Sequence, residues 1–310
     1  MIYPTPLQSG DEVAIIATSG PCNPTRLALG VQTLENLGLK CHIYQSCYAQ
    51  EGFLAGEDEL RLNDLHEAFS APNIRGIFVA RGGYGSQRLL PFINCEIIKN
   101  NPKIFAGYSD VTALHTLFNQ QCQLVTFHAP MPAVDFGSQT INPQTLEGFT
   151  SVILSPLPIT PAQFNLSASI LTHHQLHAPI AAPLTGGNLT LIASSLGTPF
   201  EINTTHKILF LEEVNEEPYK VDRLLLQLKL ARKLDNVVAI VLGDFTPFTI
   251  DDYAQSLRDI LFPLHIPIFS SFACGHGEPN YTIPLGATIT LNSLPTSPNK
   301  ALPPTAPLLD

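Results

Sequence analysis

The sequence predicts an α/β protein of two domains, the first with a mostly parallel sheet. Apolar runs alternate with helical patterns through the first half of the chain, and the apolar residues within each run are continuous. This pattern is typical of parallel strands that are covered on both faces. The alternation resumes after a stretch rich in Pro, Ser and Thr at about 136–182, which indicates a connection between domains. A chain of 310 residues, 45% of them hydrophobic, is long enough for two moderate cores.

The elements of the first half follow one another in strand–helix order. Each strand is a short apolar run, and each helix is a longer stretch with helical periodicity. The first helix is expected to end at Gly38, because glycine favours the left-handed cap of a helix. Strands are expected in EVAIIATSGP (12–21), LKCHIYQ (39–45), GIFVA (76–80), KIFAGYS (103–109) and LVTFHAP (124–130), and helices at 24–37, 57–71 and 111–120.

The second half begins with PLTGGNLTLIASSLGTPF (183–200) and resumes the same order. Strands are expected in KILFLEEV (207–214), VVAIVLGDF (237–245) and IPIFSSFACGH (266–276), with helices at 218–232 and 252–262. We place the first domain at 1–160 and the second at 161–292. The last residues, 293–310, contain several prolines and no pattern, so we expect a loose tail.

Composition excludes several classes of function. The net charge is −10 and no cluster of Lys or Arg stands out, so no nucleic-acid partner is expected. The apolar run VAIIA near the start is too short for a signal sequence or a membrane span, so we expect no membrane partner and a cytoplasmic location. The six cysteines form no CxxC pair and are interpreted as reduced thiols.

Ser109 stands where a buried strand passes directly into a helix, in GYSDVTALH (107–115). The simplest interpretation is a helix N-cap, whose hydroxyl satisfies a backbone N–H. The alternative is a nucleophile, since ligands of open α/β sheets bind at the carboxyl ends of strands and Gly107 permits a tight turn. Val111 replaces the second glycine of G-x-S-x-G, so we expect a less cramped turn than the hydrolase elbow.

A serine nucleophile needs a base and a group that orients the base. Glu212, followed by Glu213, ends the apolar run ILFL, and His276 lies between two glycines after the strand IPIFSS. Taken singly, Glu212 is more simply interpreted as a solvated charge at a strand end, and His276 as an ordinary loop residue. Together they complete the order Ser–Glu–His at three strand ends, which favours a catalytic triad.

The turn RGGYG (81–85) contributes a glycine cluster after another strand. It lacks both G-x-G-x-x-G and the Lys-Ser/Thr of a P-loop, so nucleotide binding is weakly supported. Its alternative use is to donate a backbone N–H to an oxyanion, together with the N–H of Asp110.

These segments together resemble the LD-carboxypeptidases (muramoyltetrapeptide carboxypeptidases) of the S66 serine peptidases, a family that includes microcin C self-immunity peptidases. The most specific matches are RGGYG, GYSD and LEEVNEEPY, and further matching segments run in family order over much of the chain. The resemblance implies an N-terminal Rossmann- or flavodoxin-like sheet, mostly parallel, and a smaller mixed α/β C-terminal domain.

The resemblance also implies the roles of the site residues. Ser109 is then the nucleophile, His276 the general base and Glu212 its orienting carboxylate. The oxyanion donors are the N–H of Asp110 and one from Gly82 or Gly83, between which the sequence does not decide. Glu213 stands where relatives often have Asp.

The implied reaction needs no cofactor and no metal, and the implied substrate is a murein tetrapeptide or its glycan-linked form. The enzyme would cleave the bond between the L-centre of a diamino acid and the terminal D-alanine, in peptidoglycan recycling. Arg81, Tyr84 and His128 are candidate substrate contacts, although a salt bridge bracing the turn is an equal role for Arg81. Relatives are often homodimers, but no dimer face is evident from the sequence.

Three alternatives remain open at this stage. The first is a peptidase of the microcin C type that cleaves a peptide–nucleotide conjugate, and the second is a non-catalytic binding protein for a small ligand. The third is metal-dependent hydrolysis, suggested by His173, His174 and His177 in HHQLH and by Cys274-x-His276. No carboxylate accompanies these three histidines, so the third is weakly supported.

Overall fold

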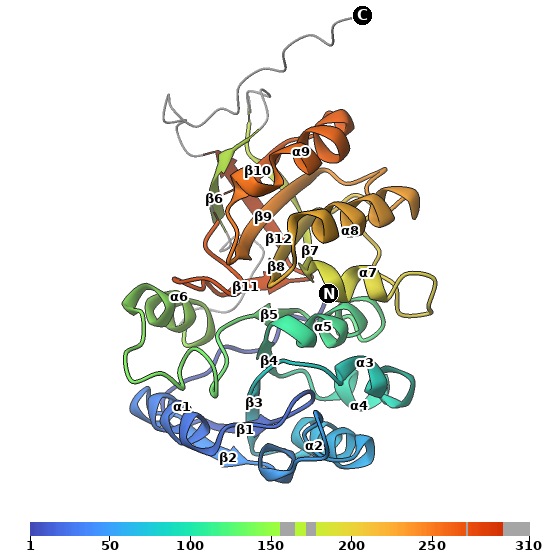
Figure 1. Ribbon diagram of the computed structural model, residues 1–310. Helices are drawn as coiled ribbons and strands as arrows, with labels where there is room; N and C mark the ends of the chain where they lie inside the picture. The colour runs from blue at the N-terminus through green and yellow to red at the C-terminus, as the bar shows by residue number, and fades with distance from the viewer. Residues whose placement is uncertain (156–164, 172–177, 271, 294–310) are drawn as a thin grey trace, which may run out of the picture.

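The computed structural model describes residues 1–155, 165–171, 178–270 and 272–293 (Figure 1). Within these ranges the chain forms two bodies, one above the other in Figure 1: a six-stranded sheet flanked by helices and a closed barrel. Helices and strands occur in both, and the predicted α/β class is therefore confirmed.

The six-stranded sheet has the order β11-β5-β4-β3-β1-β2. Its neighbouring strands are parallel, with the exception of β11, which is antiparallel to β5. The strands are β1 (Glu12–Ile16), β2 (Lys40–Ile43), β3 (Ile74–Val79), β4 (Ile104–Gly107), β5 (Thr126–His128) and β11 (Ile283–Leu285). The helices of this part are α1 (Pro24–Asn36), α2 (Asp58–Ser70), α3 (Ser86–Leu89), α4 (Cys95–Asn100), α5 (Thr112–Gln120) and α6 (Pro143–Ile153).

Helices cover both faces of this sheet, as the continuous apolar strands predicted. In Figure 1, α1 and α6 lie on one face and α2 to α5 on the other. Successive side chains of a strand point to opposite faces, so Val13 and Ile15 of β1 join one buried cluster while Ala14 and Ile16 join the other. Each apolar run therefore supplies two cores at once.

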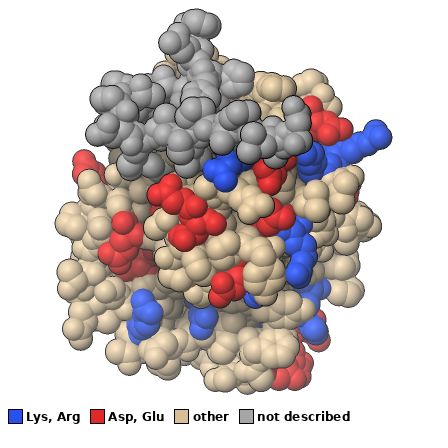
Figure 2. Space-filling view, turned by 45° about the horizontal axis from the view of Figure 1, so that its top comes forward, with Lys and Arg blue, Asp and Glu red and all other residues tan. Residues whose placement is uncertain are grey.

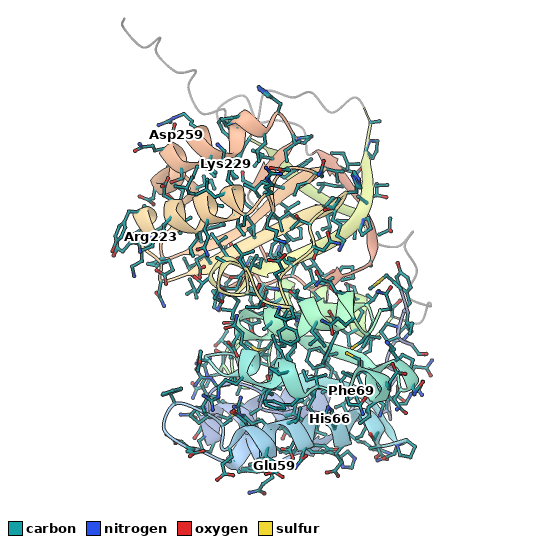
Figure 3. The ribbon with its side chains drawn as sticks, turned by 90° about the vertical axis from the view of Figure 1, so that its right-hand side faces the viewer. Glu59, His66, Phe69, Arg223, Lys229 and Asp259 are labelled. Carbon is teal, nitrogen blue, oxygen red and sulfur yellow. The ribbon has the colours of Figure 1, made fainter. Side chains whose placement is uncertain are left out.

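The barrel has the strand order β10-β6-β12-β7-β8-β9. Its strands are β6 (Asn165–Ile170), β7 (Ile180–Asn188), β8 (Ile208–Val214), β9 (Ala239–Thr246), β10 (Ile268–Ser270) and β12 (Thr288–Ser293). The helices α7 (Leu189–Ser194), α8 (Pro218–Leu230) and α9 (Ala254–Ser256) lie outside it (Figure 1). Figure 3 shows α8 with Arg223 and Lys229 facing the same side of the molecule as α2 with Glu59 and His66.

One apolar core joins the two bodies. On β8, Ile208 and Phe210 belong to the cluster that also contains Phe127 of the first sheet. The alternate residues Leu209 and Leu211 pack with α8 in a separate cluster. Strand β8 is therefore buried on both faces up to Leu211, directly before Glu212.

Some elements differ from the sequence expectation. The Pro- and Ser-rich stretch contains the 11-residue helix α6, which starts at an Asn142 cap followed by Pro143, a favoured pair at a helix start. The expected helix at 252–262 is instead a succession of short 3₁₀, α and π turns from Ile250 to Leu264. Strand β11 lies in the stretch assigned to the second domain but pairs with β5 of the first sheet.

The distribution of charged side chains and the character of the helices bear on possible partners. Lys and Arg side chains are interspersed with Asp and Glu over the face in Figure 2. Among the described residues, no helix has both the length and the apolar character needed to cross a membrane.

Candidate active site

Ser109 lies in the turn between β4 and α5, at the carboxyl end of the first sheet. Its φ angle is 66°, a left-handed conformation that costs a non-glycine residue about 1–3 kcal/mol. Gly107 allows close packing beside it, because a Cβ there would lie 3.1 Å from Val79 Cβ, so Val79 would have to shift by a few tenths of an ångström. The hydroxyl of Ser109 caps neither the 3₁₀ turn nor α5. The turn thus holds Ser109 in a strained conformation although the second glycine of the hydrolase elbow is absent.

Glu212 and His276 meet across the second body. Glu212 is on β8 and is 0% exposed, and its Oε2 lies 2.7 Å from His276 Nδ1. Burial by itself lowers the pKa of His276, but the Glu212 charge and hydrogen bond outweigh it, and the pKa is raised above its usual value. With Nδ1–H donating to Glu212, Nε2 is the nitrogen that can accept a proton.

His276 also lies beside the strand end that carries Ser109. The Tyr108 ring is 4.9 Å from the His276 ring, centroid to centroid. Within the described residues, the bond to Glu212 is the side-chain hydrogen bond that His276 forms. A nucleophile–base hydrogen bond often tightens only when substrate binds, so this geometry is compatible with proton transfer from Ser109.

The loop that carries His276 is anchored on its first side by Asn280. Gly275 N donates to Asn280 Oδ1 at 3.1 Å, and Asn280 Nδ2 donates to Asp135 Oδ1 at 3.2 Å. Asn280 N donates to Thr145 Oγ1 at 2.9 Å. Asn280 is 0% exposed. It therefore links the His276 loop to two residues from the segment that follows the parallel strands.

The other side of the same loop packs against Asp244, near the end of β9. Burial raises the pKa of Asp244 to about 6, although the neighbouring backbone N–H of Gly277 acts to lower it. A Cβ at position 277 would lie 2.6 Å from Asp244 Cγ, so a side chain there would displace the Asp244 carboxylate. Asp244 follows an apolar run just as Glu212 does, and this signal could have identified it from the sequence.

Gly82 and Asp110 bring two backbone segments together at Ser109. A Cβ on Gly82 would lie 2.9 Å from Ser109 Oγ and 3.4 Å from Asp110 N. The turn is fixed by a hydrogen bond from Gly20 N to Gly82 O at 3.2 Å. Within the described residues, no turn or loop hydrogen bond uses the N–H of Gly82, Gly83 or Asp110. These N–H groups are therefore free to bind an oxyanion beside Ser109.

The side chain of Asp110, which sequence reasoning missed, ties these two segments to each other. Asp110 Oδ2 accepts from Ser86 N at 2.7 Å, and Asp110 is 1% exposed. Burial raises its pKa. Ser86 Oγ lies 2.9 Å from the hydroxyl oxygens of both Thr18 and Ser19. A buried polar network therefore sets the spacing between the glycine turn and the serine turn.

The Glu213 carboxylate is held by hydrogen bonds from neighbouring residues of the second body. Its carboxylate accepts from Asn188 Nδ2 at 2.9 Å and from Thr190 N and Oγ1 at 2.8 and 2.7 Å. Thr190 is in the first turn of α7, so Glu213 joins β8 to the start of that helix.

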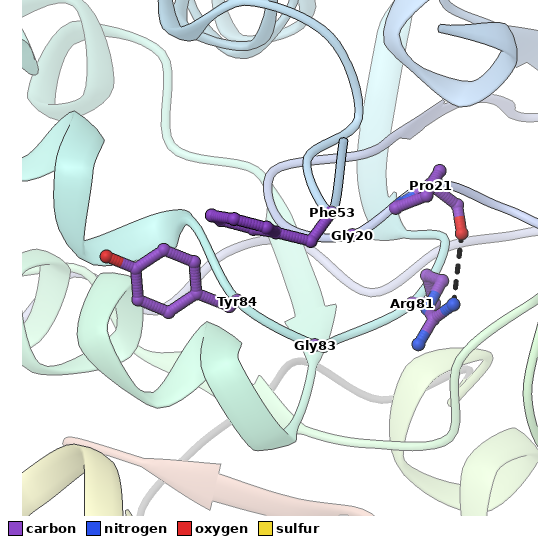
Figure 4. Close-up of a pocket in the computed structure, with 6 residues that line it drawn as sticks. All are labelled: Gly20, Pro21, Phe53, Arg81, Gly83 and Tyr84. Carbon is purple, nitrogen blue, oxygen red and sulfur yellow. Dashed lines mark hydrogen bonds between the residues drawn. The ribbon is translucent and has the colours of Figure 1, made fainter. Parts of the chain in front are cut away.

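Of the three candidate substrate contacts, two line a surface pocket and the third is buried. Arg81 and Tyr84 line a surface pocket together with Phe53 (Figure 4). His128 is 0% exposed, with its ring centroid 5.4 Å from that of Tyr108 and 5.2 Å from that of Phe210. It packs behind Tyr108 and does not open into the pocket.

The metal alternative finds no support among the described residues. No group of three or more His, Cys, Asp or Glu side chains there is arranged to hold a metal. Cys274 is 0% exposed and its Sγ is 3.1 Å from Tyr281 O. The histidines of HHQLH lie outside the described residues.

The chain is similar to known proteins over most of its length. Models of the LD-carboxypeptidase N-terminal and C-terminal domains match residues 13–129 and 181–291. A probable murein peptide carboxypeptidase of Bacillus subtilis is 37% identical over 296 residues, which cover 94% of this chain and 91% of that protein.

Two solved structures are also similar. A muramoyltetrapeptide carboxypeptidase from Oxalobacter formigenes has a TM-score of 0.78 at 27% identity, covering 90% of this chain and 94% of that one. An MccF-like protein from Bacillus anthracis has a TM-score of 0.82 at 27% identity, covering 94% and 95%. The chain therefore belongs to the LD-carboxypeptidase family of S66 serine peptidases and is a serine-type carboxypeptidase.

Proposed function

We propose that this carboxypeptidase releases the terminal D-alanine from murein tetrapeptides, free or glycan-linked, by cleaving the bond to the L-centre of a diamino acid. The observation that carries the proposal is the buried Glu212–His276 pair, with Oε2 and Nδ1 2.7 Å apart, beside a serine held at a φ of 66°. Relatives named for murein peptides supply the substrate class. A role in recycling murein fragments in the cytoplasm follows as part of this proposal.

The proposed mechanism is acyl transfer through Ser109. Neutral His276 Nε2 takes the proton of the Ser109 hydroxyl as its oxygen attacks the scissile carbonyl carbon. The tetrahedral oxyanion is bound by the N–H of Asp110 and by an N–H of the Gly82–Gly83 turn. One such donor commonly lowers the barrier by about 3 kcal/mol.

Collapse of this intermediate breaks the peptide bond. Protonated His276 gives its proton to the leaving amine of D-alanine, while the Glu212 carboxylate stabilises the imidazolium. Water then attacks the acyl-enzyme with His276 again as the base. The products are the shortened peptide and free D-alanine, and Ser109 is regenerated.

The test is mass spectrometry of a murein tetrapeptide incubated with the wild type and, in parallel, with Ser109→Ala. We expect release of one alanine by the wild type alone, and no loss of activity on addition of a chelator. A tetrapeptide that ends in L-alanine is the control for stereochemistry and should remain intact. Release of D-alanine by Ser109→Ala at the wild-type rate would overturn the serine mechanism.

A second candidate is cleavage of a peptide–nucleotide conjugate. It is favoured by the similarity to an MccF-like protein, MccF being the name of a microcin C7 self-immunity protein. It is also favoured by the exposed aromatic rings of Phe53 and Tyr84 beside Arg81, since such a surface can stack a base. Incubating the same two proteins with an aminoacyl-nucleotide conjugate distinguishes the candidates. Cleavage of the conjugate without release of D-alanine from the tetrapeptide would select this second function.

A further inference from the structure

A pocket opens directly beside the proposed oxyanion turn (Figure 4). Its volume is about 680 Å³, and its lining residues are Gly20, Pro21, Phe53, Arg81, Gly83 and Tyr84. None of the proposed triad residues lines it. The mechanism above accounts for bond cleavage but not for selection of the last residue of a chain, so this pocket is available for that task.

Arg81 supplies the positive charge of the pocket. It is half-buried and takes part in none of the ion pairs among the described residues. Its Nη1 donates to Pro21 O at 3.0 Å, which fixes the direction of the guanidinium (Figure 4). Arginine is always charged and carries five donors. A partly buried, oriented cation without a counter-ion is therefore suited to bind an anionic ligand group.

The turn Arg81–Gly83 sets the distance between this charge and the reacting atoms. The Cβ position of Gly82 is 2.9 Å from Ser109 Oγ, and the Cβ position of Gly83 is 3.6 Å from Arg81 Nη2. Consecutive residues thus face the nucleophile and the guanidinium. In the substrate of a carboxypeptidase, the free carboxylate lies one residue beyond the scissile carbonyl, a step of about 3.8 Å between Cα atoms.

Glycine and aromatic residues complete the pocket. Gly83 has a φ of 117°, which other residues rarely adopt, and any side chain there would stand beside Arg81 Nη2. Phe53 and Tyr84 form an edge-to-face pair with ring centroids 5.5 Å apart, and they remain 67% and 48% exposed. A ligand against these rings would exclude water from the guanidinium, which strengthens its attraction for a carboxylate.

We propose that Arg81 binds the free α-carboxylate of the terminal residue of the substrate, so that this pocket restricts the enzyme to the last peptide bond. This inference rests on the proposed function, because it assigns the pocket to the leaving residue of a peptide. The glycine turn then serves two purposes, since one residue faces the oxyanion and the next faces the carboxylate site.

The test compares a tetrapeptide that ends in a free acid with the same peptide ending in a carboxamide. The amide is isosteric but has no charge, so we expect the wild type to prefer the acid about 100-fold in kcat/KM, the size expected for a charged hydrogen bond. Arg81→Gln should lower kcat/KM for the acid about 100-fold and leave that for the amide within about threefold. Arg81→Lys should recover part of the preference, because it keeps the charge but not the planar fork.

A matched control is Arg88→Gln, which removes an arginine from the helix after the same turn. Arg88 is paired with Asp58 at 2.8 Å. Arg88→Gln should therefore leave the acid-to-amide ratio of kcat/KM unchanged. If Arg81→Gln lowers kcat/KM equally for the acid and the amide, Arg81 only braces the turn and the proposal is wrong. If the variant keeps the wild-type kcat/KM for both peptides, the carboxylate binds elsewhere and the proposal is again wrong.

Failure of the proposed function gives a different result, namely that the wild type releases neither D-alanine from the acid nor D-alaninamide from the amide. Binding to Ser109→Ala by calorimetry tests the pocket without turnover. We expect the free acid to bind more tightly than the amide, and the difference to vanish in Ser109→Ala/Arg81→Gln. Equal binding of both peptides to Ser109→Ala would overturn the carboxylate site.

Discussion

Asn280→Ala tests whether the anchoring of the His276 loop is needed for both stability and activity. The substitution removes two hydrogen bonds, from Gly275 N at 3.1 Å and to Asp135 Oδ1 at 3.2 Å. Each buried group left without a partner costs roughly 1–3 kcal/mol. Asp135 keeps its bond from Met131 N, so we expect a loss of about 3 kcal/mol in the free energy of unfolding. At roughly 2 °C per kcal/mol for a chain of this size, Tm should fall by about 6 °C.

Activity should fall as well, because Gly275 directly precedes His276 in the chain. A displacement of about 1 Å in a catalytic group can lower the rate about 100-fold, so we expect kcat to fall 10- to 100-fold with little change in KM. Tm is measured by calorimetry, and kcat and KM by D-alanine release. The control is Asn73→Ala, which removes an exposed bond of 2.6 Å to Glu12. Wild-type kcat with a lowered Tm would refute a positioning role, and an unchanged Tm would refute the energetic reasoning itself.

Three further predictions follow from the site. Gly82→Ala should lower kcat at least 100-fold, because its Cβ would lie 2.7 Å from Ser109 Cβ and disturb the oxyanion turn; a rate within threefold of wild type would contradict this. The acidic limb of kcat/KM should lie above pH 6.5, since Glu212 raises the His276 pKa, and Glu212→Gln should move that limb to lower pH while reducing kcat; a limb that stays in place would remove Glu212 from this role. Asp244 has a folded-state pKa of about 6 against an ordinary 3.8, so its contribution to the free energy of unfolding falls as pH rises from about 4 to 6. The Tm of Asp244→Asn should therefore rise relative to that of the wild type as pH increases over that range. A Tm difference between the two proteins that does not depend on pH would disprove the assignment.

Much of the first body could be predicted from the sequence because its signals are local. Continuous apolar runs such as that of β3 identify buried parallel strands, and the helix after Ser109 follows from periodicity. Helix α6 was missed because Pro, Ser and Thr dominate its neighbourhood, although its Asn142–Pro143 start is visible. The stretch 250–264 departs from one regular helix, and tertiary packing rather than periodicity sets its local hydrogen bonding.

The sequence by itself determined which residue types stand at the strand ends and in what chain order. It indicated Ser109, Glu212 and His276 because glycines and apolar runs mark turns and strand ends locally. Only the tertiary structure decided which of these side chains meet. The Glu212–His276 bond spans 64 residues and the Asn280–Asp135 bond spans 145, and no local pattern encodes such contacts. The absence of a counter-ion for Arg81 among the described residues is likewise a property of its three-dimensional surroundings, because a counter-ion can come from any part of the chain.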